Sequence, residues 1–343
     1  MSALTLNPSD ISPARRILGG ALRSREIAVA AVLVLVIAAT TVKNSHFMFG
    51  ANGWRDLLLT PSILLILAVG QTAVVITRNV DLSVGSVVGL TAYLTGRIFI
   101  AHPGMPVFLV FLIGLAFGGV LGLINGTLVA WGKVPALVIT LGTMYIYRGV
   151  FLSWAGSNRV NASDMPDSFL NLGTKQILSV PLLTIVAIIV LAVVGYYLYT
   201  ARGGRELYAI GSDPEAAQLY GLKVTRRILA AFILSGALAG LAGVATAARY
   251  GTVSSNAGLN LELQAVGAAV IGGVAIFGGS GTVWGAAIGA FLLVTINRAL
   301  PVLGVQDFWQ QFVVGVLIIG SIVLDRVLSV RRDRKIIEAR DNA

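Results

Sequence analysis

The stretch VFLVFLIGLAFGGVLGLINGTLVAW, residues 107–131, decides the fold, because it contains no Asp, Glu, Lys or Arg. An α-helix needs roughly 20 apolar residues to cross the hydrocarbon core of a bilayer. Hydrocarbon offers no partner for a free N–H or C=O group, so the segment must satisfy its own backbone. A β-barrel would require shorter segments of alternating hydrophobicity. Residues 107–131 are therefore predicted to form a transmembrane helix.

Further apolar segments lie on both sides of this stretch. They are found at 27–43, 57–77, 83–101, 134–154, 178–200, 228–249, 263–278, 283–300 and 309–328. Together the segments predict an all-α polytopic membrane protein with about ten transmembrane helices. The segment 263–278 is short and ends in the run GGSG, Gly278 to Gly281, which favours a broken or re-entrant helix.

The composition agrees with a single lipid-embedded domain. Hydrophobic residues make up 56% of the 343 residues and charged residues 12%, and the mean hydropathy is +0.86, which leaves too little polar surface for a soluble globule. We expect the membrane domain to span 27–328, between a basic N-terminal segment at 1–26 and a basic tail at 329–343.

Catalysis finds little support in the sequence. There is no Cys, and the two His, His46 and His102, are far apart, which disfavours redox chemistry and a metal cluster. Phosphate-binding-loop, HExxH and GxSxG motifs are also missing. We therefore expect a chain that is not an enzyme and binds no cofactor or metal of its own. If ATP drives it, a separate chain must bind ATP and Mg.

Lys and Arg are concentrated in three places: 1–26, 201–227 and 329–343. Such an excess marks the cytoplasmic segments of membrane proteins. The N-terminus and the C-terminus are therefore predicted to be cytoplasmic. The same effect explains the net charge of +10 without nucleic-acid binding.

The segment ARGGRELYAIGSDPEAAQLYGLKVTRR, residues 201–227, is the longest predicted cytoplasmic loop. Asp213 is placed to cap a short helix, Pro214 and Glu215 suit its first turn, and Gly221 suits its end. A capped helix between two spans is either a docking element for a partner or a surface helix that lies in the lipid headgroups.

Glycine patterns point to close helix packing. The pairs Gly114 and Gly118, Gly118 and Gly122, Gly122 and Gly126, Gly236 and Gly240, and Gly285 and Gly289 have small-xxx-small spacing. Such glycines allow helices to pack closely, either in a fixed arrangement or in one that lets the helices slide past each other during transport. The stretches TRNVDLSVGSVVGL (77–90) and GLNLELQAVGAAVIGG (258–273) each place acidic or amide residues before a Gly-rich apolar helix, on opposite predicted faces, as inverted repeats would.

Four stretches carry a family resemblance. They are TRNVDLSVGS (77–86), GTLVAWGKVPALVITLGTMYIYRG (126–149), GRELYAIGSDPEAAQLYG (204–221) and LELQAVGAAVIGGVAIFGGSGTVWGAAIGA (261–290). In this order they resemble permease subunits of bacterial ATP-binding-cassette (ABC) sugar importers of the ribose, xylose and arabinose branch, and look most like the autoinducer-2 and rhamnose permeases.

The resemblance implies a ten-span fold related to the vitamin B12 permease type (type II importer) in the bacterial inner membrane. It also implies three partners: an ABC ATPase that holds ATP and Mg, a periplasmic or lipoprotein sugar-binding protein, and a second copy or a similar permease. The expected activity is alternating-access import of a monosaccharide or sugar-like molecule of the rhamnose, autoinducer-2 or pentose type. The alternative is a secondary sugar transporter driven by an ion gradient, although few acidic residues lie within the spans to carry protons.

The resemblance assigns residues of the loop 201–227 to ATPase coupling. These are Gly203, Arg205, Gly211, Asp213, Pro214, Glu215, Ala216, Ala217 and Gly221.

Polar residues near the apolar segments are candidates for the sugar path. Charges at membrane depth are costly and usually face protein or water. The hypothesis is that hydrogen bonds from a small set of side chains organise the gates or the path: Asn79, Asp81, Ser83, Asn125, Glu262 and Gln264. The structural alternative is an Arg78–Asp81 pair or helix cap, with Asn125 and Asn297 as contacts between helices.

Overall fold

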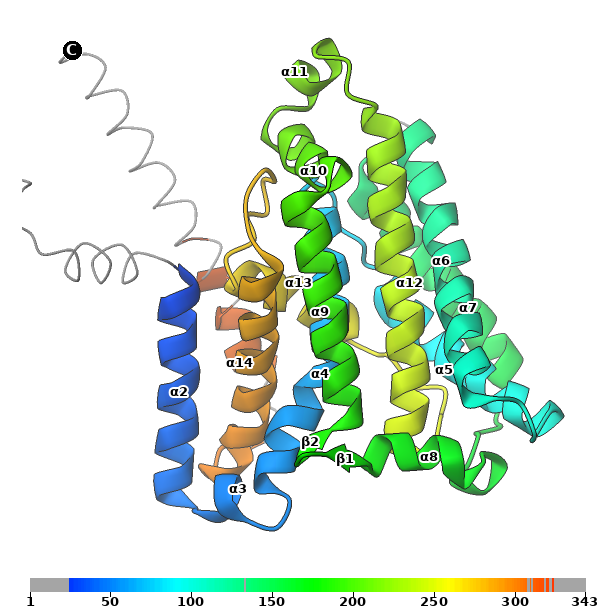
Figure 1. The fold of residues 1–343 in the computed structure, drawn as a ribbon, viewed down its shortest axis with the longest axis vertical. Coiled ribbons are helices and arrows are strands. Elements are labelled where there is room, and N and C mark those ends of the chain that lie inside the picture. The colour runs from blue at the N-terminus through cyan, green and yellow to red at the C-terminus, as the bar shows by residue number, and fades with distance from the viewer. Residues whose placement is uncertain are drawn as a thin grey trace, which may run out of the picture.

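A computed structural model describes residues 25–132, 134–306, 309, 311–317, 319–320 and 323. Within this part of the chain, eight helices are long and apolar enough to cross a membrane. They are α2 (Arg25–Lys43), α4 (Gly53–Val75), α5 (Val84–Ala101), α6 (Val107–Gly132), α7 (Ala136–Ala155), α9 (Leu182–Thr200), α12 (Val224–Tyr250) and α14 (Val283–Val302). The prediction of an all-α polytopic membrane protein is confirmed (Figure 1).

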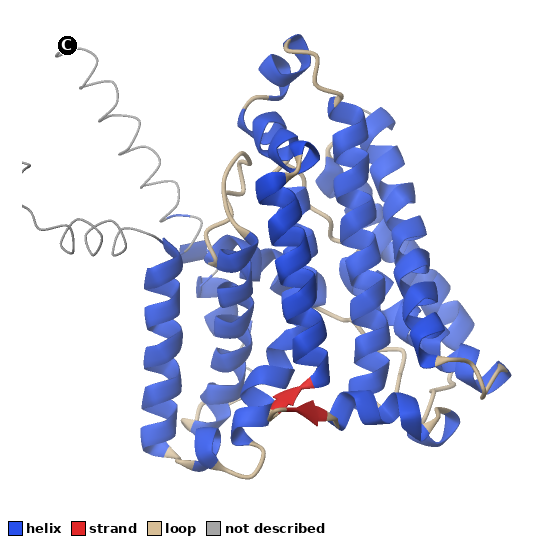
Figure 2. Ribbon diagram, viewed as in Figure 1, coloured by secondary structure: helices blue, strands red, loops and turns tan. Residues whose placement is uncertain are grey.

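Short elements gather at the two ends of the bundle. The helices α10 (Arg202–Ser212) and α11 (Pro214–Leu219) form one end, which we call the coupling face. The opposite face carries α3 (His46–Phe49), η2 (Ala162–Asp164), α8 (Asp167–Thr174) and the small hairpin of β1 (Gln176–Ile177) and β2 (Val180–Pro181), which Figure 2 shows in red.

Helices α4 and α12 form the centre of the bundle, and both are buried along most of their length. Helix α12 packs against α4, α5 and α6. Its contact with α6 is made by glycines: Gly118 and Gly122 of α6 face Gly236 and Gly240 of α12. The predicted close packing at this small-xxx-small motif is confirmed, because the two backbones approach too closely to leave room for a side chain.

Gly118→Ala is expected to destabilise the protein by about 2 kcal/mol through overpacking. Its Cβ would overlap with the carbonyl oxygen of Gly236 and lie 2.7 Å from the Cα of Gly240. The neighbouring Gly119→Ala is the matched control, since its Cβ would meet only the Cβ of Ala237 at 3.7 Å. Thermal unfolding in mild detergent compares the two variants, and equal midpoints would contradict the packing role of Gly118.

Two helices begin inside the bundle. Ser86, in the first turn of α5, donates a hydrogen bond to the carbonyl of Met144, which lies two turns (about 12 Å) below the start of α7 at Ala136. The helix α13 (Leu261–Ile271) begins at the same depth, because a Cβ on Gly85 would lie 2.6 Å from the carbonyl oxygen of Gly258. The N-terminal ends of α5 and α13 therefore meet within the bundle.

The predicted eighth span, 263–278, is not one continuous helix. The segment after α12 first runs without regular helix to residue 260, and α13 then covers only Leu261–Ile271. A helix of this length is too short to cross the hydrocarbon alone. Glycines with positive φ at Gly273, Gly278, Gly279 and Gly281 turn the chain back into α14. The count of about ten full-length spans is not reached within the described residues.

The first described helix, α2, starts at its end nearer the coupling face. Glu26 of α2 accepts a hydrogen bond from the hydroxyl of Thr282, next to the loop that contacts α10. Of the predicted segments, 309–328 lies only partly within the described residues. The predicted tail 329–343 lies outside them, as does most of 1–26.

Candidate functional site

The helix α11 forms where the loop 201–227 predicts it. The Asp213 carboxylate accepts hydrogen bonds from the backbone N–H groups of Glu215 and Ala216, both at 3.0 Å, and Pro214 begins the helix. The chain leaves α11 through Gly221, whose φ of 78° favours glycine. The predicted cap, first turn and stop are all confirmed.

The sequence analysis missed α10, which follows α9 after the single residue Ala201. Its small residues make close contact possible: a Cβ on Gly203 would lie 2.7 Å from the Tyr197 hydroxyl, and one on Gly211 would lie 2.6 Å from the backbone N of Gly279. Arg205 points outward and donates to the carbonyl of Thr200. A strong amphipathic pattern was present in residues 202–212 and could have revealed this helix.

The tip of α11 presents two apolar side chains to its surroundings. Leu219 is 88% exposed and Tyr220 is 87% exposed, whereas Ala217 is buried against the rest of the loop. Glu215 is exposed and Ala216 partly buried. A short capped helix with an exposed Leu–Tyr pair at its end has the features of a protein-docking element.

Two inner loops attach α10 to the membrane domain. Arg78, which follows α4, donates from Nε to the carbonyl of Gly211 at 2.6 Å and from a terminal nitrogen to the carbonyl of Ser212. The Tyr208 hydroxyl donates to the carbonyl of Gly281 at 3.0 Å, and the backbone N of Gly279 donates to the carbonyl of Ile76 at 2.9 Å. A movement of α10 would therefore also move the segments that lead into α5 and α14.

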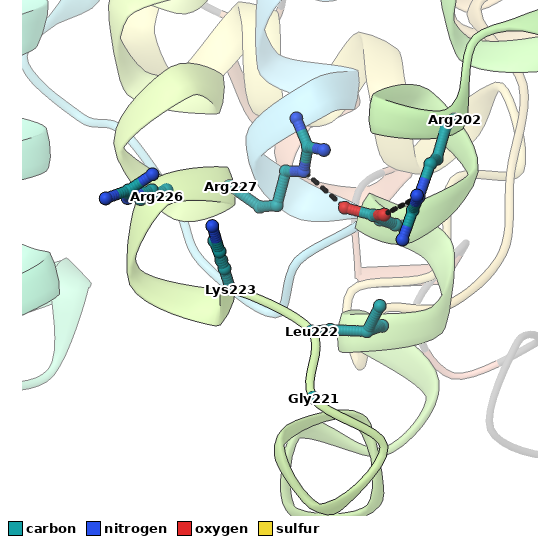
Figure 3. Close-up of a pocket in the computed structure, with 7 residues that line it drawn as sticks. Arg202, Gly221, Leu222, Lys223, Arg226 and Arg227 are labelled. Carbon is teal, nitrogen blue, oxygen red and sulfur yellow. Dashed lines mark hydrogen bonds and ion pairs between the residues drawn. The ribbon is translucent and has the colours of Figure 1, made fainter.

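A third attachment joins α10 to α12. The Glu206 carboxylate accepts from Nε of Arg202 at 2.8 Å and from Nε of Arg227 at 2.5 Å, the two contacts dashed in Figure 3. The hydrogen bond from Arg227 lowers the pKa of Glu206 below its ordinary value; burial opposes this shift and the hydrogen bond from Arg202 adds to it. Arg226 and Lys223 line the same groove of about 380 Å³ and make it basic.

Glu206→Gln is expected to lower the thermal midpoint at pH 7. Because the folded-state pKa lies below the ordinary 4.5, the carboxylate stabilises the fold above that pH, and the effect is lost as pH falls through the lowered pKa. The midpoints of parent and variant should therefore approach each other as the pH falls below 4.5. Thermal unfolding across pH 3.5 to 7 measures this, with Asp167→Asn, at an exposed residue of α8, as control. A constant difference at all pH values would contradict the bridge.

Asp81 is fully buried inside the bundle, where its side chain joins three helices. Oδ1 accepts from the backbone N of Ser83 at 3.0 Å, from the Ser83 hydroxyl at 2.7 Å and from Asn125 of α6 at 3.4 Å. Oδ2 accepts from the hydroxyl of Ser235 in α12 at 3.1 Å. The carbonyl of Asp81 also accepts from the side chain of Gln71 in α4.

The candidate path residues do not all meet. Asp81, Ser83 and Asn125 form one network, with Tyr147 of α7 donating to Asn125 Oδ1 at 3.2 Å. Within the described residues, the side chain of Asn79 bonds only to Thr77, nearby in the chain. The alternative Arg78–Asp81 pair is wrong, because Arg78 turns to Gly211. Asp81 does accept from the backbone N–H of Ser83, the residue directly before α5.

Glu262 and Gln264 lie on α13 and share no hydrogen bond with the Asp81 network among the described residues, although the Glu262 carboxylate lies against Gly85 in the first turn of α5. Oε2 of Glu262 is buried with no hydrogen-bond partner among the described residues. Arg148 of α7 donates to the carbonyl of Ala257 at 2.8 Å and so holds the segment before α13. Gln264 lines a cavity on the side away from the coupling face.

Comparison with known proteins places the chain among permeases. Residues 54–322 match the family described as the branched-chain amino acid transport system / permease component. The D-allose transport system permease protein AlsC of Escherichia coli (strain K12) is 33% identical over 299 residues, which are 87% of this chain and 90% of that protein. No solved structure matches the chain.

Two further relatives are autoinducer 2 import system permease proteins LsrC. The protein of Escherichia coli (strain K12 / DH10B) is 36% identical over 274 residues, 80% of this chain and 79% of that protein. The protein of Enterobacter sp. (strain 638) is 35% identical over 305 residues, 89% and 87% of the two chains.

Proposed function

Because this chain belongs to the family described as the branched-chain amino acid transport system / permease component, we propose that it is the membrane permease subunit of an ABC importer for a monosaccharide or sugar-like small molecule. The relatives described above carry the names of D-allose and autoinducer 2 permeases, which favours a sugar-like substrate over an amino acid. The chain itself is then a transport subunit, and a separate ATPase binds ATP and Mg.

The observation that carries this proposal is the arrangement of α10 and α11. A docking helix with an exposed tip stands beside a basic groove, and hydrogen bonds connect its base to the segments that lead into α5, α12 and α14. An ATPase that binds α11 would therefore act directly on the membrane domain. On this basis we assign the coupling face to the cytoplasm of a bacterial inner membrane, together with the start of α2.

The mechanism we propose is alternating access. ATP-driven movement of the ATPase shifts α10 and α11, and the Arg78 and Gly279 contacts transmit the shift to the segment that leads into α5 and to the loop that follows α13. These helices begin inside the bundle, where glycine backbones touch, so small displacements there open or close a path. A second copy or a similar permease completes the path, and an external binding protein delivers the sugar.

Co-purification tests the proposal. The tagged chain is solubilised in mild detergent from its native membranes, and every associated protein is identified by mass spectrometry. We expect an ABC ATPase and a sugar-binding protein. Recovery of the chain alone, together with uptake that persists in cells lacking the ATPase, would instead support a secondary transporter driven by an ion gradient.

A further inference from the structure

A cavity of about 610 Å³ opens in the half of the bundle away from the coupling face. Its walls come from the first half of α4, the last turns of α12, the segment 252–259, the first turn of α13 and the second half of α14. The segment 252–259 has no regular helix, and part of its backbone is bonded to the protein: Val253 pairs with Val160, and the carbonyl of Ala257 accepts from Arg148. Non-helical backbone at membrane depth is tolerated where it lines a water-filled cavity.

The wall of the cavity is rich in uncharged hydrogen-bonding groups. Thr60, Thr246, Asn256, Gln264 and Asn297 contribute hydroxyl and amide groups, and none of the described lining residues is acidic. Hydroxyls and amides both donate and accept, as do the hydroxyls of a sugar. No carboxylate among the described lining residues is available to pair with the ammonium group of an amino acid.

The two arginines of the wall are held in place by the protein. Arg249 donates to the carbonyl of Thr60 at 3.1 Å and to its hydroxyl at 3.0 Å, and its guanidinium lies 5.0 Å from the ring centre of Tyr250. Arg298 donates to the carbonyls of Gly53 at 3.1 Å and Phe47 at 3.2 Å. Each guanidinium therefore uses some of its N–H groups for hydrogen bonds within the protein. Tyr250 adds an aromatic ring to the wall beside Arg249.

Three side chains in the wall still lack partners. The Asn297 Oδ1 atom is buried and accepts no hydrogen bond from the described residues. The side-chain amides of Gln264, which is partly buried, and of Asn256, which is exposed, make no hydrogen bond within the described part of the chain. A buried polar atom without a partner is unfavourable, so a ligand that donates a hydrogen bond to it would gain binding free energy.

We propose that this cavity binds the transported solute, a neutral polyhydroxylated molecule, in the outer half of the permease. Asn297 and Gln264 hydrogen-bond its hydroxyl groups, and Tyr250 packs against its apolar face. The proposal rests on the assignment of the chain as a sugar permease and adds the place and the residues at which the sugar is held.

The natural absence of Cys permits a direct test, because any introduced Cys is the only one in the chain. Ser254→Cys places a thiol in the cavity wall at a residue that the proposal does not assign to sugar binding. Leu178→Cys, at a residue 94% exposed in the β1–β2 turn on the same face, is the matched control. Purified permease in nanodiscs is labelled with a small charged thiol reagent, alone and with D-allose, D-ribose, L-rhamnose or L-leucine at saturating concentration.

We expect at least one of the three sugars to slow labelling of Ser254→Cys several-fold, with no effect on Leu178→Cys. Protection by leucine alone, no protection by any of the sugars, or equal protection at both positions would overturn the proposal. Labelling requires neither ATP nor the ATPase, so its outcome is separate from that of the co-purification experiment.

A second variant tests the unpartnered amide. Asn297→Ala is expected to reduce sugar uptake roughly tenfold, the loss of about one hydrogen bond to the ligand, while the ATPase still co-purifies. Asn171→Ala, in the exposed α8, serves as control and should transport normally. Normal uptake by Asn297→Ala would contradict the role of this residue. Loss of the ATPase would show that the variant misfolds; the labelling experiment does not depend on this variant.

Discussion

Replacing both Leu219 and Tyr220 by Asp is expected to remove the ATPase from the purified complex and to abolish uptake. The two side chains are almost fully exposed at the tip of α11, where an ATPase would bury them. Central apolar side chains of an interface often contribute 2 kcal/mol or more, which is about 30-fold in affinity for each residue. Introduced carboxylates would add a desolvation cost on top of that loss.

The helix itself should survive this double change, because the Asp213 cap and Pro214 are untouched. Normal thermal unfolding and unchanged expression of the variant would confirm this. Leu178→Asp, an equally exposed apolar residue on the opposite face, is the control and should retain the ATPase. A stoichiometric amount of ATPase bound to the double variant would contradict the assignment of α11 as the docking helix.

The second large effect is expected from Asp81→Ala, which should destabilise the membrane domain by about 3 kcal/mol and abolish transport. Asp81 is fully buried, and its carboxylate accepts hydrogen bonds from Ser83, Asn125 and Ser235. Removing the carboxylate leaves these donors without an acceptor in the interior. It also releases the start of α5 from α6 and α12.

Thermal unfolding in detergent measures the loss, and Asp167→Ala in the exposed first turn of α8 is the control. The stability of Asp81→Asn should lie between those of the parent and Asp81→Ala. The amide keeps one acceptor oxygen, but its NH2 group replaces the other and faces groups that are themselves donors. An Asp81→Ala variant as stable as the control would show that the network holds no helices together.

The exposed tip and the buried carboxylate differ in how far the sequence could predict them. The capped helix from Pro214 to Leu219 was predictable, because a cap, a proline and a stop glycine act within one turn of each other. The contact of Ser235 with Asp81 was not, since the two residues lie 154 positions apart in the chain. The contact of Arg78 was also not predictable. Its closeness to Asp81 in the sequence suggested an ion pair, but the fold brings it to Gly211, 133 positions away.

The sequence by itself determined that this protein is a helical membrane protein and where most of its helices run, because hydrocarbon forces every long apolar segment to satisfy its own backbone. It also determined the cap of α11, which is a local hydrogen-bonding pattern. Only the tertiary structure decided that α5 and α13 begin inside the bundle, that Glu206 joins α10 to α12, and that Gln264 and Asn297 share one cavity. Such contacts depend on how whole helices cross, and helix crossing is set by the shapes of surfaces that are distant in sequence.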